Sequence, residues 1–214
     1  MILSRGRRYI FVHIPKTGGT SLALALESKA MADDVMLGDT PKAIKRRGRV
    51  KGLKTSGRLW KHSRLTDLYG LVDQEEMETF FVFTLVRNPW DRAVSYYHWL
   101  KQQNFDHPAV RAANTLDFSG FLADAGTQAA FSNDRAAAYV SDKNGTDRCD
   151  LYLRLEHLDE DVTRLEAALD LKLGQIPHEN RSQRGAYRGY YSDADAAFIR
   201  RLFADDIARF DYTF

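Results

Sequence analysis

The stretch Phe11-Val12-His13-Ile14-Pro15-Lys16-Thr17-Gly18-Gly19-Thr20-Ser21-Leu22 determines how this chain folds. Apolar, β-favouring residues from Tyr9 to Ile14 predict a buried strand. Pro15 and the pair Gly18-Gly19 then require a tight loop. The two hydroxyl residues that follow, Thr20 and Ser21, are candidate N-caps for a helix that starts there.

A strand, a glycine-containing loop with a lysine and a helix N-terminus together form a cradle for an anion. Backbone N–H groups converge in such a loop, and the helix dipole adds positive potential. Lys16 supplies a full positive charge. We therefore interpret the loop as the site for the phosphate end of a nucleotide cofactor.

A second strand–loop–helix unit follows later in the chain. Phe80–Val86 gives the strongest strand signal of the sequence, and a helix is predicted from Pro89 to about Gln103. Arg87, between them, carries a planar fork of donors that suits an oxyanion. Ser95, two turns into the helix, adds a hydroxyl on the same side. Two anion sites at the ends of adjacent strands suit a ligand with phosphate groups at two places.

Strand and helix patterns alternate along the rest of the chain. Leu151–Leu155 predicts a third strand, Leu158–Leu171 an amphipathic helix, and Ser192 caps a last helix. This order predicts an α/β fold, P-loop-like, with three layers and a central, mostly parallel sheet flanked by helices. At 214 residues the chain is expected to form a single domain over residues 1–214.

Charge and cysteine content narrow the class of protein. Residues 1–64 contain 15 Lys and Arg against 4 Asp and Glu, which indicates an anionic ligand. Nucleic acid is the competing partner, but the basic residues lack the interleaved aromatics of a single-strand platform, so we expect none. Cys149 is the one cysteine of the sequence, and no apolar run is long enough for a membrane span. A soluble, cytoplasmic protein is expected.

The first loop differs from the Walker A motif of nucleoside triphosphate enzymes. In that motif the lysine follows the last glycine, whereas Lys16 precedes Gly18-Gly19. The strong strand ends in Arg87, where a Mg²⁺-dependent enzyme would place a carboxylate. These features weigh against a nucleotide-dependent kinase, which is one alternative. A non-catalytic module that binds nucleotide or nucleic acid is the other.

Two motifs match a known family. His13–Ser21 resembles the 5′-phosphosulfate loop of sulfotransferases that use 3′-phosphoadenylyl sulfate (PAPS), and Phe83–Tyr97 resembles their 3′-phosphate motif. The motifs lie in the expected order, about 70 residues apart. The likeness is greatest to Golgi carbohydrate sulfotransferases, especially the heparan sulfate 2-O and 6-O types, and to their small bacterial relatives.

The resemblance implies in-line transfer of a sulfuryl group from PAPS to an acceptor hydroxyl without a metal ion. A fixed cation at the bridging oxygen of the leaving phosphate stabilises the transition state, and Lys16 suits that role. His62 is the implied general base, because a catalytic histidine of the 2-O and 6-O enzymes lies before the Arg-containing strand. The implied cofactor-binding residues are Lys16, Thr17, Gly18, Gly19, Thr20, Ser21, Arg87, Ser95 and Arg184.

The sequence leaves the acceptor open. A carbohydrate is what the resemblance implies, and a lipid headgroup, a small alcohol or a peptide tyrosine are alternatives. His13 also borders the loop, but a histidine at a strand end more often orients a loop than acts as a base.

Overall fold

The computed structural model describes residues 1–177 and 185–214, and the chain divides into two compact units. The first, the sheet unit, consists of Met1–Val86 and Ala136–Asn180. The second, the helical unit, consists of Arg87–Arg135 and Arg181–Phe214. The single domain expected from the chain length therefore remains a prediction.

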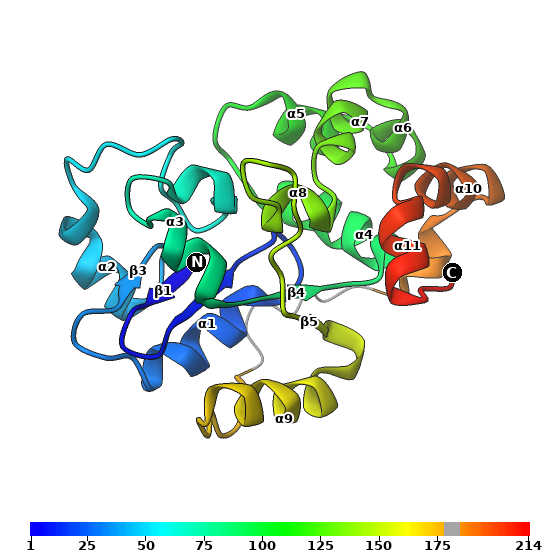
Figure 1. Cartoon of the computed structure of the whole chain (residues 1–214). Helices are drawn as coiled ribbons and strands as arrows, with labels where there is room; N and C mark the ends of the chain where they lie inside the picture. Colours follow the sequence, from blue (N-terminus) through cyan, green and yellow to red (C-terminus); the bar gives the residue numbers. More distant parts are fainter. Residues whose placement is uncertain (178–184) are drawn as a thin grey trace. The chain divides into compact units, whose positions relative to one another are not determined.

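The sheet unit is built on a mixed five-stranded sheet with the order β3-β1-β2-β4-β5 (Figure 1). The strands are β1 (Ile2–Ser4), β2 (Tyr9–Val12), β3 (Val35–Met36), β4 (Phe81–Val86) and β5 (Leu151–Arg154). β2, β4 and β5 pair in parallel, as the alternating pattern predicts. β1 pairs antiparallel with both β2 and β3, which the expected mostly parallel sheet did not include. The α/β fold with a central sheet is confirmed; β1 and β2 form an antiparallel hairpin, and β3 is the edge strand beside β1.

Two of the helices of this unit, α1 and α9, lie where the sequence predicts them. The helical segments of the unit are α1 (Gly19–Ser28), α2 (Pro41–Arg46), η1 (Arg47–Val50), η2 (Leu65–Leu68), α3 (Gln74–Thr79), α8 (Ala136–Val140), η3 (Leu155–His157) and α9 (Leu158–Leu169). One core cluster joins α1 and α9 to the sheet, through Leu22 and Leu26 of α1 and Val162 and Leu165 of α9. These side chains pack with Phe11 and Phe83, whose strand positions face each other in the β2–β4 register. This core therefore holds α1 and α9 against the sheet.

The carboxyl ends of β2 and β4 are tied together. The Thr84 hydroxyl donates to the backbone oxygen of Val12 at 2.7 Å, and Val12 is the register partner of Thr84. Parallel strands end at the same edge of a sheet, so the chain leaves both strands at that edge. His13 follows β2 directly, and Arg87 follows β4.

The helical unit consists of α4 (Pro89–Leu100), α5 (Pro108–Thr115), α6 (Phe118–Ala123), α7 (Ala125–Ser132), η4 (Tyr187–Tyr190), α10 (Asp193–Leu202) and α11 (Ala204–Phe210). α4 starts at Pro89, as predicted, because the Asn88 side chain accepts hydrogen bonds from the backbone N–H groups of Trp90 and Asp91. The predicted last helix is two helices, α10 and α11. Trp90 is fully buried, and its indole N–H donates to the backbone oxygen of Ala196 at 2.9 Å. Within the described residues, no helix is long and apolar enough to cross a membrane.

Candidate active site

The loop between β2 and α1 has an unusual backbone. Lys16 and Gly18 both adopt left-handed conformations, with φ of 64° and 87°. The Thr17 hydroxyl, fully buried, donates to the backbone oxygen of Ile14 at 2.9 Å and closes the turn. A lysine in this region of the map costs about 1–2 kcal/mol, and such strain is concentrated at functional sites.

The helix after the loop begins earlier than the sequence predicts. Its N-cap is Gly18, in the left-handed conformation, so Thr20 and Ser21 belong to the first turn of α1 and are not N-caps. No side chain caps this helix end. The prediction of Thr20 or Ser21 as the N-cap was wrong because the loop ends at Gly18, which is in the left-handed conformation and precedes both hydroxyl residues. A helix N-terminus without a side-chain cap has backbone N–H groups that lack intrahelical partners, and these suit an anion.

Each loop glycine has a specific reason. A Cβ at Gly19 would lie 2.2 Å from Cδ2 of His13, so the imidazole of His13 lies against the start of α1. A Cβ at Gly18 would lie 2.8 Å from Cδ1 of Leu155, at the end of β5, and the positive φ of Gly18 independently disfavours other residues. The loop is therefore held between the histidine ring and the β5 end.

His62 lies beside this loop in the sheet unit. Its Nδ1 is 2.8 Å from the backbone oxygen of His13, and the two imidazole rings meet edge to face with centroids 4.6 Å apart. A carbonyl oxygen only accepts, so Nδ1 must carry the proton. In the neutral ring, Nε2 is then the basic nitrogen. Trp60 also packs edge-on against His62, with ring centroids 5.0 Å apart.

His13 is a buried, neutral histidine. Its side chain has 6% exposure, and burial lowers its pKa well below the usual value for histidine. The positive charges of Lys61 and Lys16 lower the pKa further.

The second predicted anion site lies in the helical unit. Arg87 donates from Nε and Nη2 to Oδ2 of Asp91, at 2.8 and 2.6 Å. Ser95 lies on α4 and is buried. Asp91 and Ser95 are four residues apart and therefore share one face of the helix with the guanidinium that Asp91 holds. The pairing with Asp91 was not foreseen, although its i,i+4 spacing from Arg87 could have revealed it.

The predicted site residues belong to both units of the chain. Arg184 lies outside the described residues. The loop residues from Lys16 to Ser21 and His62 all belong to the sheet unit, and Arg87 and Ser95 to the helical unit. Within the described residues, no group of three or more His, Cys, Asp or Glu side chains is placed to hold a metal ion.

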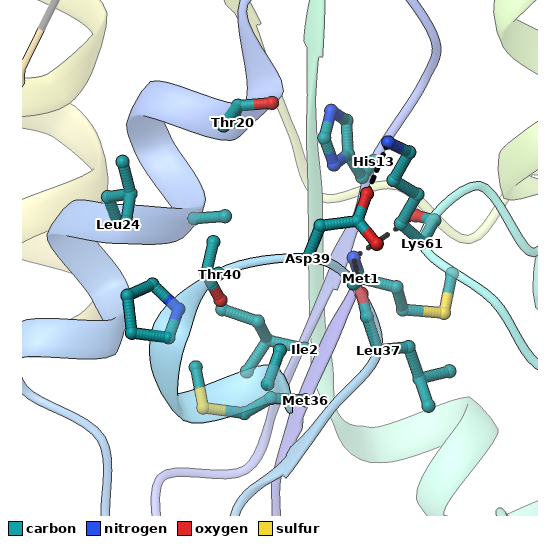
Figure 2. Close-up of a pocket in the computed structure, with 14 residues that line it drawn as sticks. Met1, Ile2, His13, Thr20, Leu24, Met36, Leu37, Asp39, Thr40 and Lys61 are labelled. Carbon is teal, nitrogen blue, oxygen red and sulfur yellow. Dashed lines mark hydrogen bonds and ion pairs between the residues drawn. The ribbon is translucent and has the colours of Figure 1, made fainter. Parts of the chain in front are cut away.

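The sheet unit also contains a cavity of about 380 Å³ (Figure 2). His13 and Thr20, from the loop and the first turn of α1, are part of its lining. Figure 2 shows α1 on one side of this space and Asp39 with Lys61 on the other. The lining joins segments up to 60 positions apart, which no local pattern in the sequence reveals.

Parallel strands that end in a glycine loop and an uncapped helix N-terminus define a class of α/β proteins that bind the phosphate or sulfate end of a nucleotide. Within that class, a specific family model, described as the sulfotransferase family, matches residues 1–213. The chain belongs to this family, and the resemblance of its two motifs to sulfotransferases is confirmed at that level.

Among solved structures, the chain is similar to a mouse sulfotransferase, SULT7A1, whose crystal structure is described as complexed with PAP. The identity is 15%, the match covers 93% of this chain and 82% of the mouse chain, and the TM-score is 0.50. This likeness supports the fold. A comparison with curated protein sequences gives no match.

Proposed function

We propose that this chain transfers a sulfuryl group from PAPS to an acceptor hydroxyl. Membership of the sulfotransferase family supports sulfuryl transfer over the kinase and binding-only alternatives. PAPS supplies the activated sulfuryl group, attached to its 5′-phosphate, and carries a second phosphate at the 3′ position. The donor groups of the loop suit the first of these ends, since an uncapped helix N-terminus and a lysine both favour an anion.

The observation that carries the mechanism is the hydrogen bond from His62 to the backbone oxygen of His13. With the proton on Nδ1, Nε2 is the nitrogen that we propose accepts the proton of an attacking hydroxyl. The edge-on contacts with His13 and Trp60 restrict rotation of the ring. A base that is already oriented loses less entropy when the acceptor arrives.

Lys16 is the proposed electrophilic partner of this base. The turn that Thr17 closes holds the backbone of Lys16 in a strained conformation. The position of the Lys16 Cα in the loop is therefore fixed. Negative charge develops on the bridging oxygen as the leaving phosphate departs. A cation positioned there lowers the barrier selectively, because the charge is greater in the transition state than in the ground state.

Arg87 and Ser95 are the proposed partners of the 3′-phosphate. Two features support this: Arg87 follows the β4 strand, and Asp91 fixes the plane of its guanidinium through two donors. Arginine binds phosphate oxygens in a forked geometry, and a serine on the same helix face adds a hydroxyl. Arg184 is retained as a proposed cofactor residue on the strength of the family resemblance alone.

The test is ligand-dependent thermal stability followed by transfer. Adenosine 3′,5′-bisphosphate (PAP), the expected product, should raise the melting temperature without Mg²⁺, whereas ATP with Mg²⁺ should not. At 100 times the dissociation constant, binding stabilises the folded state by about 2.7 kcal/mol, which raises the melting temperature of a chain of this size by roughly 5–10 °C. Sulfur-labelled PAPS should then label an acceptor from a panel of sugars, alcohols, lipids and tyrosine peptides.

The proposal fails if PAP produces no shift while ATP with Mg²⁺ does, or if oligonucleotides bind with a steep salt dependence and PAP has no effect. The carbohydrate acceptor and the cytoplasmic location remain predictions from the sequence.

A further inference from the structure

Most of the positive charge in the N-terminal part of the chain lies in one stretch. Residues 41–64 contain 10 of the 31 Lys and Arg residues of the sequence and none of the 29 Asp and Glu residues. The rest of the chain has 21 Lys and Arg against 29 Asp and Glu. The proposed sulfuryl-transfer site uses His62 but no Lys or Arg of this stretch, so that site does not explain the concentration of charge.

Some of these basic side chains hold the stretch against the sheet unit. Nζ of Lys42 donates to the backbone oxygen of Glu27 at 2.6 Å. Arg46 and Arg49 both donate to the backbone oxygen of Asp34, at 3.3 and 2.9 Å. These bonds fix α2 and η1 beside β3, the edge strand of the sheet (Figure 1). The backbone of the stretch is therefore anchored in the fold, and the exposed side chains stand on a defined surface.

Four other basic side chains have no such structural role. Lys45, Arg47, Lys51 and Lys54 are exposed, and no hydrogen bond or ion pair joins their side chains to another residue in the described part of the chain. Like charges gathered on one surface repel each other and attract an anionic partner. Their charge is therefore available to a partner outside the chain.

Two large apolar side chains flank these four charges. Ile44 is 50% exposed and Leu53 is 44% exposed. They lie at or next to the ends of residues 44–54, here called the basic segment, in which every residue except Arg46 and Val50 is exposed. Single exposed apolar side chains are common, but here two of them border a run with six Lys and Arg. Basic and apolar side chains together are typical of segments that lie in a lipid headgroup layer.

The apolar side chains favour a lipid surface over a nucleic acid. Single strands bind by stacking their bases on aromatic side chains, and the basic segment contains no aromatic residue. A duplex presents phosphates without an apolar layer beneath them. At a lipid surface, basic groups meet the phosphates while aliphatic side chains enter the boundary with the acyl chains.

We infer that the basic segment binds the surface of an anionic lipid membrane. The attachment is peripheral: Lys45, Arg47, Lys51 and Lys54 lie at the headgroup phosphates, and Ile44 and Leu53 enter the layer below. This binding is separate from sulfuryl transfer, so either activity can be tested without the other.

The experiment is co-sedimentation of the whole chain with lipid vesicles. The protein should bind vesicles of equal parts phosphatidylcholine and phosphatidylglycerol, but not phosphatidylcholine alone, and added salt should weaken the binding. Each basic residue at an anionic surface contributes about fivefold to the partition coefficient, so Lys51→Gln/Lys54→Gln should lower it about 25-fold. Arg200→Gln/Arg201→Gln is the matched control, because it removes two exposed positive charges from α10.

The apolar contribution has its own pair of variants. Leu53→Ala should lower the partition coefficient at least about fourfold, which corresponds to the burial of one methylene. Leu116→Ala is the control, because Leu116 is also exposed, at 38%, and lies in the helical unit. Thermal unfolding of the same samples should show similar melting temperatures for each variant and its control, since the substituted side chains are exposed.

The inference is supported if the anionic vesicles bind the protein and the variants of the basic segment lose affinity relative to their controls. It is overturned if both kinds of vesicle bind equally, or if either variant behaves like its control. It is also overturned if an oligonucleotide or heparin binds under the same conditions and the vesicles do not.

Discussion

Substitutions of His62 can test the roles of its two ring nitrogens separately. The side-chain amide of asparagine overlays Nδ1 of histidine, so His62→Asn retains a donor to the backbone oxygen of His13 and removes the basic Nε2. Glutamine reaches the Nε2 position but has no donor at Nδ1. His62→Ala removes both. The three variants therefore distinguish a base from a residue that only supports the loop.

The magnitudes follow from the 2.8 Å hydrogen bond and from the chemistry of general bases. A neutral hydrogen bond contributes about 0.5–1.5 kcal/mol, so His62→Ala and His62→Gln should lower the melting temperature by roughly 1–6 °C, and His62→Asn by less. Loss of a general base costs about 10²–10⁴ in rate, or roughly 3–5 kcal/mol of barrier. All three variants should lose that much in kcat and retain the PAP affinity.

The assays are single-turnover transfer of labelled sulfate, PAP calorimetry and thermal unfolding on the same samples. The reasoning is refuted if His62→Asn retains turnover within a few-fold of the unmodified protein. It is also refuted if the loss of rate follows the loss of stability across the three variants, because His62 would then be structural.

Three further predictions concern the loop and the second anion site. The rate of sulfuryl transfer should fall at least 100-fold in both Lys16→Ala and Lys16→Gly. The glycine variant should unfold at a higher temperature than the alanine variant, since glycine accepts the positive φ at this position. Equal melting temperatures would contradict the backbone strain at Lys16. Arg87→Ala should weaken PAP binding by about 10–100-fold and leave adenosine 5′-phosphate binding unchanged, by calorimetry, because only PAP carries the 3′-phosphate; equal losses for both ligands would place Arg87 elsewhere. Burial lowers the pKa of His13 and keeps its ring neutral in the folded state. The unfolded chain binds a proton at this residue below about pH 6.5. The free energy of unfolding should therefore fall as pH drops below that value, by up to about 1.4 kcal/mol per pH unit. Denaturant titrations from pH 8 to 5 should show a smaller slope in His13→Gln.

Part of the fold was predictable because it depends on local patterns. The continuous apolar run before Arg87 and the proline after it define β4 and the start of α4 to within one residue. The short strands β1 and β3 were not predicted, because two or three residues are too few to show a period of two. β1 pairs antiparallel with β2 through a tight turn that no strong Asn-Gly or Asp-Gly signal marks, and β3 pairs with β1 only after the chain has passed through β2 and α1.

Residues of the candidate site could be predicted where their type and position suit one role. They could not be predicted where the same residue type serves several roles. A lysine before paired glycines indicates an anion loop here because a predicted strand precedes it and a predicted helix follows. The N-cap at Gly18 was missed because threonine, serine and glycine all occur at helix starts, and only the backbone angle distinguishes them. The partnership of Arg87 and Asp91 was missed for a similar reason, since an acid four residues away is as often a solvated charge.

The orientation of His62 depends on the backbone oxygen of His13 and not on a side chain. This affects which substitutions the site can tolerate during evolution. Every amino acid carries a carbonyl oxygen, so no substitution at position 13 deletes the acceptor that holds Nδ1. Side-chain changes there can alter the packing against Gly19 without removing the restraint on the neighbouring ring. The proposed base is thus protected against sequence drift at position 13, and relatives with other residues at this position can keep the same tautomer.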